Sequence, residues 1–226
     1  MHTKRHKMPK TWPVARKGTK YVVRPNFSIN DGVPVLVLLR DMLKVAQNRK
    51  EVKTALREKK ILLNTSPVFE EKNNILLFDT ITIVPSNKYY KMSITDKGKF
   101  DVEEIDEKDS TKKVAKIVDK KILKGKKIQL NLSDGRNFLS DIKCRMGDSA
   151  VINFKENKIT ECVPFSVGSN AIVVAGKYSG KKGLIKNIHE ENKSAELESN
   201  GEIVNVLIKQ MMAVENGKSN GKTCKE

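Results

Sequence analysis

The pattern of hydrophobic and polar positions divides the chain into a helical part near its start and a long series of short strands. Apolar residues recur at helical spacing from residue 34 to residue 46, which predicts a helix with Pro34 at its first position. Its apolar face consists of Val35, Leu38, Leu39, Met42 and Ala46. Asn48 is a favourable N-terminal cap for a second helix over residues 49–58. Both apolar faces are predicted to be covered by a protein core.

Beyond residue 60, short apolar segments at regular spacing are typical of strands. The predicted strands are residues 61–64, 81–84, 114–118, 150–154, 159–163, 172–175, 195–198 and 202–208. Residues 126–139 are predicted to form a hairpin, because Ile128, Leu130 and Leu132 alternate with polar residues and Asp134-Gly135 supplies the turn. Ser199-Asn200-Gly201 signals another hairpin turn. Polar residues 70–74 and acidic residues 101–109 are predicted to be loops, the second facing solvent.

The charge of the chain is strongly positive and unevenly distributed. There are 44 Lys and Arg against 27 Asp and Glu, a formal net charge of +17. Residues 1–60 hold 16 basic and 4 acidic residues, and the first acidic residue is Asp31. Such a balance attracts polyanions and predicts salt-sensitive binding to nucleic acid. The alternative is a solvated charge run without a partner.

Residues 1–33 are predicted to be a basic extension, because they combine many cations and prolines with little periodicity. A segment of this kind buries little apolar surface by itself but can order against a polyanion. Its candidate RNA-binding cations are Lys4, Arg5, Lys7, Lys10, Arg16, Lys17, Lys20 and Arg24. Trp12 has two open interpretations: it stacks on an RNA base or sugar, or it anchors the extension to the protein's own surface.

Two further segments are candidates for RNA binding. On the second helix, Lys50 and a basic stripe could follow a phosphate backbone; the stripe consists of Arg49, Lys53, Arg57 and Lys60. The alternative is an ordinary solvated helix face. In residues 176–188, lysines alternate with glycines, so backbone and ammonium groups can approach a phosphate together. The candidates there are Gly176, Lys177, Gly180, Lys181, Lys182 and Gly183, and turn geometry alone is the alternative role of the glycines.

Other chemistry has weak support in the sequence. The cysteines, Cys144, Cys162 and Cys224, form no CxxC pair, and the three histidines complete no zinc pattern, so no metal or other cofactor is expected. The apolar run Val35–Leu39 is far too short to span a bilayer. The basic start lacks the apolar stretch of a signal peptide, and we expect a soluble, cytoplasmic protein.

The order helix, helix and strand pair resembles the alpha-L RNA-binding fold, first recognised in bacterial small-subunit ribosomal protein four. The matching stretches are NRKEVKTALREKKILLN and FDTITI. The chain departs from the family pattern at Asn64-Thr65 and Phe78-Asp79, where that family usually has an Asn-Gly turn and a glycine-aspartate pair. The same unit occurs in RNA-modifying enzymes, so it does not identify a function by itself.

The whole chain resembles a different family, archaeal and eukaryotic small-subunit ribosomal protein four. The resemblance rests on the stretches PVLVLLRDMLKVA, KGKKIQLNLSDGRNFL and VPFSVGSNAIVVAGKYSGKKGLIKNI, the last of which looks like a KOW motif. It implies a multi-domain α+β protein with an alpha-L unit, a β-rich central domain and a small SH3-like KOW barrel. The implied divisions are a basic extension, an alpha-L domain, a central domain, a KOW domain and a disordered tail, at residues 1–33, 34–86, 87–168, 169–216 and 217–226.

The resemblance implies a structural constituent of the small ribosomal subunit that binds its ribosomal RNA and neighbouring ribosomal proteins. It implies no cofactor, small-molecule substrate or membrane. An archaeal type is expected, because a eukaryotic member would continue further. An RNA-modifying enzyme is disfavoured, because Asp41, Asp79 and Asp134 fit structural roles on a helix surface, at a strand end and in a turn. The remaining alternative is a KOW-containing transcription or translation factor that binds RNA transiently.

Overall fold

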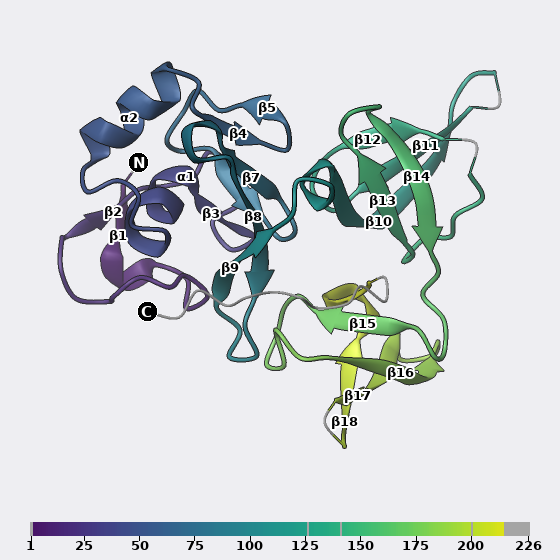
Figure 1. Ribbon diagram of the computed structural model, residues 1–226. Coiled ribbons are helices and arrows are strands. Elements are labelled where there is room, and N and C mark those ends of the chain that lie inside the picture. Colours follow the sequence, from purple (N-terminus) through teal and green to yellow (C-terminus); the bar gives the residue numbers. More distant parts are fainter. Residues whose placement is uncertain (1, 126, 141, 200, 215–226) are drawn as a thin grey trace. The chain divides into compact units, whose positions relative to one another are not determined.

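The computed structural model of the protein describes residues 2–125, 127–140, 142–199 and 201–214, which form two compact units (Figure 1). The first unit holds the described residues up to Thr95 together with Lys99–Thr111. The second holds Asp96–Gly98 and the described residues from Lys112 onward. No helix in the described ranges is long and apolar enough to cross a membrane. The predicted tail 217–226, Cys224 and Asn200 lie outside the described residues.

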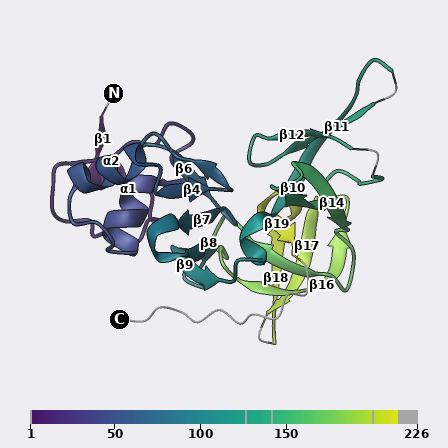
Figure 2. The same cartoon turned by 45° about the horizontal axis from the view of Figure 1, so that its top comes forward.

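The first unit combines short helical segments with antiparallel strands around one hydrophobic core (Figure 2). Its strands are β1 (Thr3–Lys4), β2 (Tyr21–Val22), β3 (Gly32–Pro34), β4 (Ile61–Leu63), β5 (Ser66–Pro67), β6 (Asn74–Leu76), β7 (Thr80–Ile83), β8 (Lys88–Ile94) and β9 (Phe100–Ile105). Its helices are η1 (Arg5–Lys7), α1 (Val35–Val37), η2 (Leu38–Met42), α2 (Arg49–Arg57), η3 (Val84–Ser86) and η4 (Asp109–Thr111). β1 pairs with β2, β3 pairs with β6, and the larger sheet has the order β5-β4-β7-β8-β9.

The predicted helix over residues 34–46 is present only in part. Pro34 ends β3 and caps α1 instead of opening the helix, and the chain is helical only from Val35 to Met42. The second half, η2, is a π-helix, in which the Leu43 N–H donates to the Leu38 carbonyl at 2.9 Å. All residues from Val35 to Leu39 are buried, so this segment is surrounded by core and not packed on one face alone.

The acidic loop predicted for residues 101–109 is wrong over its first half. Residues Phe100–Ile105 form β9, which pairs with β8 and buries Phe100 and Val102 in the first core. Asp101 and Glu103 lie on the face of β9 opposite Phe100 and Val102, whereas exposed Glu104 follows Val102 on the apolar face and breaks the alternation. Because three acidic residues mask the alternation, the sequence pattern is typical of a loop.

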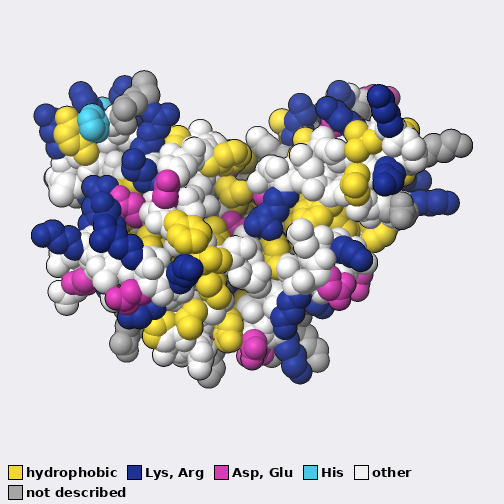
Figure 3. Space-filling view, turned by 90° about the horizontal axis from the view of Figure 1, so that it is seen from above, with side chains coloured by type: hydrophobic (Ala, Val, Ile, Leu, Met, Phe, Trp, Pro, Cys, Tyr) yellow, Lys and Arg dark blue, Asp and Glu magenta, His cyan; other side chains and the backbone are white. Residues whose placement is uncertain are grey.

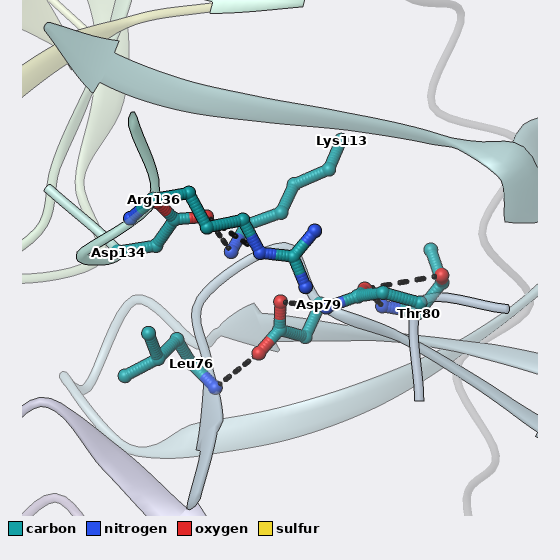
Figure 4. Close-up of polar contacts among 7 residues, drawn as sticks. Leu76, Asp79, Thr80, Lys113, Asp134 and Arg136 are labelled. Atoms are coloured by element: carbon teal, nitrogen blue, oxygen red, sulfur yellow. Dashed lines mark hydrogen bonds and ion pairs between the residues drawn. The ribbon is translucent and has the colours of Figure 1, made fainter. Parts of the chain in front are cut away.

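Two tight turns explain where the chain departs from the alpha-L pattern. Asn64 and Thr65 join β4 to β5 with positive φ values of 51° and 67°, and Phe78 has a φ of 62°. These are the left-handed conformations that glycine adopts without strain, and here non-glycine residues adopt them. Buried Asp79 supports this region, because its carboxylate accepts from the Leu76 N–H and the Asn64 amide, both at 2.7 Å (Figure 4).

The second unit contains two five-stranded antiparallel sheets, each with its own hydrophobic cluster. One has the order β12-β11-β10-β13-β14 and the other β18-β17-β16-β15-β19. The strands are β10 (Lys112–Ile122), β11 (Ile128–Leu132), β12 (Asn137–Leu139), β13 (Ser149–Asn153), β14 (Lys158–Val163), β15 (Asn170–Val173), β16 (Lys182–His189), β17 (Ser194–Ser199), β18 (Glu202–Leu207) and β19 (Met211–Ala213), with helix η5 (Ile208–Gln210). The predicted strands are confirmed here to within a few residues. The predicted hairpin is confirmed as β11 and β12.

Lysines of β10 form two buried contacts. The Lys113 ammonium is 2.9 Å from the carboxylate of Asp134, and both side chains are almost fully buried (Figure 4). Asp134 therefore ties its turn to β10 as well as closing the hairpin. The Lys116 ammonium donates to the carbonyls of Ile208 and Met211, the latter at 2.7 Å, and so links the two sheets of this unit.

The first unit draws its core from several segments of the chain. The core of the first unit includes Met8 and Trp12 from the extension and Val102 from β9. The Trp12 side chain is 2% exposed, and its Nε1–H donates to the Gly32 carbonyl at 2.9 Å. The extension is thus folded onto the first unit, and strands β8 and β9 belong to that unit and not to the central sheet.

We expect Trp12→Ala to lower the free energy of unfolding by about 3–5 kcal/mol, since it removes a large buried side chain and leaves a cavity. Phe27→Ala is the matched control, because the Phe27 side chain is 55% exposed. Urea unfolding followed by circular dichroism measures both changes. Equal stability of the two variants would contradict the assignment of Trp12 to the core.

Candidate nucleic-acid interface

The backbone of the basic extension is fixed by its own contacts. β1 pairs with β2, which brings residues 3–4 against residues 21–22. The Arg5 guanidinium donates to the Thr19 carbonyl at 2.8 Å, to the Thr19 hydroxyl at 2.9 Å and to the Ala15 carbonyl. Arg5 therefore holds the intervening loop together, and most of its hydrogen-bonding capacity is used within the protein.

The other candidate cations of the extension are exposed. They are Lys4, Lys7, Lys10, Arg16, Lys17, Lys20 and Arg24. The Lys20 ammonium lies 5.4 Å from the ring centre of Tyr21, and no acidic residue precedes Asp31 in the sequence. The loop fixed by Arg5 thus displays a cluster of positive charge without acidic neighbours from its own segment.

Trp12 does not belong to this exposed surface. Its ring is buried and its only polar group is already hydrogen-bonded, so neither ring face is open to a base. Of the two interpretations of Trp12, the structure supports the anchor.

The basic stripe of α2 begins as predicted but is partly neutralised. Asn48 caps the helix, and Glu51 accepts from the backbone N–H groups of Gln47 and Asn48, at 2.7 and 3.4 Å. The Arg49 Nε–H donates to both carboxylate oxygens of Glu71, at 2.9 and 2.8 Å. Because Glu71 lies in the segment predicted to be a polar loop, this buried counter-ion was missed. A separation of 22 residues leaves no sequence signal for the pair.

Of the other cations on and beside α2, two lie near carboxylates and two are exposed. The Lys53 ammonium is 4.0 Å from Glu71, and Lys60 pairs with Glu58. Lys50 and Arg57 are exposed on the same helix. Figures 1 and 2 place α2 on the same side of the first unit as β1 and β2, and Figure 3 shows Lys and Arg side chains gathered over that side of the first unit. The structure therefore brings the extension and the second helix together within one unit.

The glycine-lysine loop joins β15 to β16 in the second unit. Lys177 and Lys182 are exposed, whereas the Lys181 ammonium is 2.8 Å from Glu202. The ammonium groups of Lys177 and Lys181 lie 5.4 and 5.6 Å from the ring centre of Tyr178. The loop thus presents one open ammonium group beside an aromatic ring, that of Lys177, while the second exposed lysine, Lys182, begins β16.

Two of the glycines are accounted for by contacts within the protein. Gly183 lies on β16 so close to β17 that a Cβ would be 1.9 Å from the Glu198 carbonyl oxygen. Gly176 has a φ of 93°, and a Cβ there would be 2.7 Å from the side-chain oxygen of Gln210. Close packing therefore explains Gly183, and the left-handed φ explains Gly176, without a ligand.

Two of the three cysteines, Cys144 and Cys162, lie among the described residues. Cys144 and Cys162 are free, and no group of three metal-ligating side chains occurs among the residues that the structure describes. Burial, together with neighbouring Cys144 and Asp148, raises the pKa of the Cys162 thiol to about 12. The thiolate, which is the form that binds metals and acts as a nucleophile, is thus strongly disfavoured.

The Arg49–Glu71 pair gives a pH-dependent prediction. Its hydrogen bonds and charge lower the pKa of the Glu71 carboxyl from its ordinary value of 4.5, so the pair stabilises the fold above that pH and loses its effect as the pH falls further. We expect Glu71→Gln to lower the free energy of unfolding by about 1 kcal/mol at pH 7, since the Arg49 side chain is half exposed. The deficit should narrow in urea titrations below pH 4.5.

Glu58→Gln is the control for this experiment. Glu58 pairs with Lys60, but both side chains are about half exposed, so little change is expected at any pH. If the loss of unfolding free energy in Glu71→Gln stayed constant with pH, the charge of Glu71 would not be its cause.

Comparison with known proteins identifies the family. A family model described as "Ribosomal family S4e" matches residues 86–159. Small ribosomal subunit protein eS4 of Methanocella arvoryzae is 38% identical over 197 residues, which cover 86% of this chain and 83% of that protein. The protein of the same name from Methanospirillum hungatei is 38% identical over 189 residues, covering 81% and 78%.

The fold is also that of a known structure. The crystal structure of 30S ribosomal protein S4e from Thermoplasma acidophilum superimposes with a TM-score of 0.70 and covers 82% of this chain and 95% of that one, at 24% sequence identity. Together with the archaeal relatives, which are matched over most of their length, this confirms the resemblance seen in the sequence. The chain belongs to the eS4, or S4e, family of archaeal small-subunit ribosomal proteins.

Proposed function

We propose that this protein is a structural constituent of the small ribosomal subunit, where it binds and stabilises the subunit's ribosomal RNA. The observation that carries the proposal is the basic surface of the first unit, on which the exposed cations of residues 4–24 are held in place by the protein's own contacts. Membership in the eS4 family supports it, because the relatives are named as small-subunit proteins. Its place is then the cytoplasmic ribosome, and its partners are ribosomal RNA and neighbouring ribosomal proteins.

Two parts of the chain have more specific proposed roles. Residues 34–86 act as an alpha-L RNA-binding unit, in which Lys50, Lys53 and Arg57 face the phosphate backbone while Arg49 is held by Glu71. Residues 169–216 act as an SH3-like KOW domain, in which Lys177 and Lys182 contact RNA beside Tyr178. Exposed ammonium groups on a rigid backbone read the charge and shape of RNA and not its base sequence. No catalytic step or cofactor is part of this function.

Sedimentation of native cell extract through sucrose gradients tests the function directly. The chain, followed by mass spectrometry, should migrate with the small subunit in about one-to-one proportion, and this association should survive a high-salt wash because many phosphate contacts act together. Recovery at the top of the gradient, or sub-stoichiometric binding removed by salt, would instead indicate a transient RNA-binding factor.

The basic loop of the extension can be tested by charge removal. Arg16→Gln, Lys17→Gln and Lys20→Gln together should make binding to small-subunit RNA less salt-dependent. The slope of log K, the binding constant, against log salt is negative, and its magnitude should fall by about 2–3, since each lost phosphate contact contributes about 0.7–0.9. The three residues are exposed, so the fold should be unaffected.

The control for the charge-removal variant is Lys112→Gln, Lys155→Gln and Lys158→Gln, called here the control triple. It removes the same number of exposed charges from the second unit, outside the proposed surfaces. An equal change of slope in both triples would assign the effect to overall charge and not to the extension.

A further inference from the structure

A second basic surface, absent from the sequence predictions, lies at the end of the β10–β11 hairpin. β10 pairs with β13 only from Lys112 to Lys116, and β12 pairs with β11 only from Gln129 to Asn131. The last strand pair of the hairpin is Ile122 with Ile128, and the Leu123 N–H closes its loop on the Lys127 carbonyl at 2.8 Å. We call residues 121–125 and 127–128 the hairpin tip; residue 126 lies outside the described residues and is not part of the proposed surface.

The hairpin tip carries concentrated positive charge. Residues 120–132 contain five lysines and no acidic residue. Among the described ones, Lys121, Lys124 and Lys127 are exposed. The ammonium group of Lys120 is instead used within the unit, where it donates to the Cys144 carbonyl at 3.2 Å. Lys120 thus marks the place where the hairpin leaves the core.

The tip also exposes apolar side chains between its lysines. The Ile122 side chain is 77% exposed and that of Leu123 is 41% exposed. In the register of the hairpin Ile122 lies opposite Ile128, on the face that further along buries Leu130 in the core. The apolar face therefore continues past the end of the core. Figure 3 shows hydrophobic and Lys or Arg side chains interleaved over the part of the second unit where β11 and β12 lie.

Charge decides which partner fits this surface. A neighbouring protein would cover the two apolar residues but would need several carboxylates to match the lysines. A double-stranded RNA offers both features at once, because its minor groove is wide and shallow, with ribose carbon atoms between two rows of phosphates. A two-stranded ribbon with apolar residues at its end and lysines on both strands matches that arrangement.

We propose that the hairpin tip is a further RNA-binding surface, which rests on the proposed function and lies in the minor groove of a double-stranded segment of small-subunit ribosomal RNA. Lys121, Lys124 and Lys127 contact phosphates. Ile122 and Leu123 lie against ribose. The surface is separate from the extension, α2 and the glycine-lysine loop in sequence and in the elements that carry it.

Salt-dependent binding of the full-length protein to naked small-subunit RNA tests the proposal. We expect Lys121→Gln, Lys124→Gln and Lys127→Gln together to reduce the magnitude of the negative slope of log K against log salt by about 2–3. The control triple should change that slope much less. We expect Ile122→Ala with Leu123→Ala to weaken binding about fivefold at unchanged slope, because it removes apolar contact and no charge. Unchanged circular dichroism and unfolding midpoints establish that the variants are folded.

The outcomes separate this proposal from the proposed function. If the wild-type protein fails to bind the RNA, the proposed function and the role of the tip are both overturned. If the wild-type protein binds and the tip variant has the slope of the control triple, the tip proposal alone is overturned. If the tip variant binds naked RNA normally but enters subunits poorly, a neighbouring protein and not RNA is the partner, which also overturns it.

Discussion

The buried indole of Trp12 is the contact on which the arrangement of the first unit's basic surface depends. Its N–H group meets the Gly32 carbonyl, and the neighbouring Thr11 carbonyl accepts from the Phe100 N–H at 2.9 Å. β3 can approach β6 closely because residue 32 is glycine, where a Cβ would be 2.2 Å from the Ile75 carbonyl oxygen. The Trp12 side chain thus ties a highly charged segment to β3, and the backbone of Thr11 ties the same segment to β9. Without such an anchor, the repulsion among the cations of the extension would favour an open chain.

The positive charge of the protein is divided between structural and available groups. Arg5, Arg49 and Lys113 are used within the fold, on backbone carbonyls or on the carboxylates of Glu71 and Asp134. Lys116 is a further case, since burial lowers its pKa to about 8 while its ammonium group donates to two carbonyls. The net charge of +17 is therefore larger than the positive charge that is available to a binding partner. What counts is the set of cations whose backbone is held rigid while their ammonium or guanidinium groups face solvent.

Glycines and lysines of the β15–β16 loop have separable roles. Gly183 is required by its close approach to the backbone of β17, and Gly176 by its left-handed φ of 93°, so their presence is explained without RNA. Close packing does not explain the lysines Lys177 and Lys182, because their side chains are exposed. A glycine-rich basic segment can thus owe its glycines to packing and its lysines to binding. The motif alone does not distinguish the two.

The sequence by itself determined the elements whose pattern is local: the capped helix α2, the Asp134-Gly135 hairpin, most strands of the second unit, the excess of positive charge and the family. The tertiary structure alone decided the rest. The burial of Trp12, the pairing of Arg49 with Glu71 and the inclusion of β8 and β9 in the first unit all join residues far apart in sequence. Local periodicity records which face of an element is apolar, but not which distant segment covers it or which carboxylate neutralises a cation. Those depend on packing of the whole unit, which no short window of sequence contains.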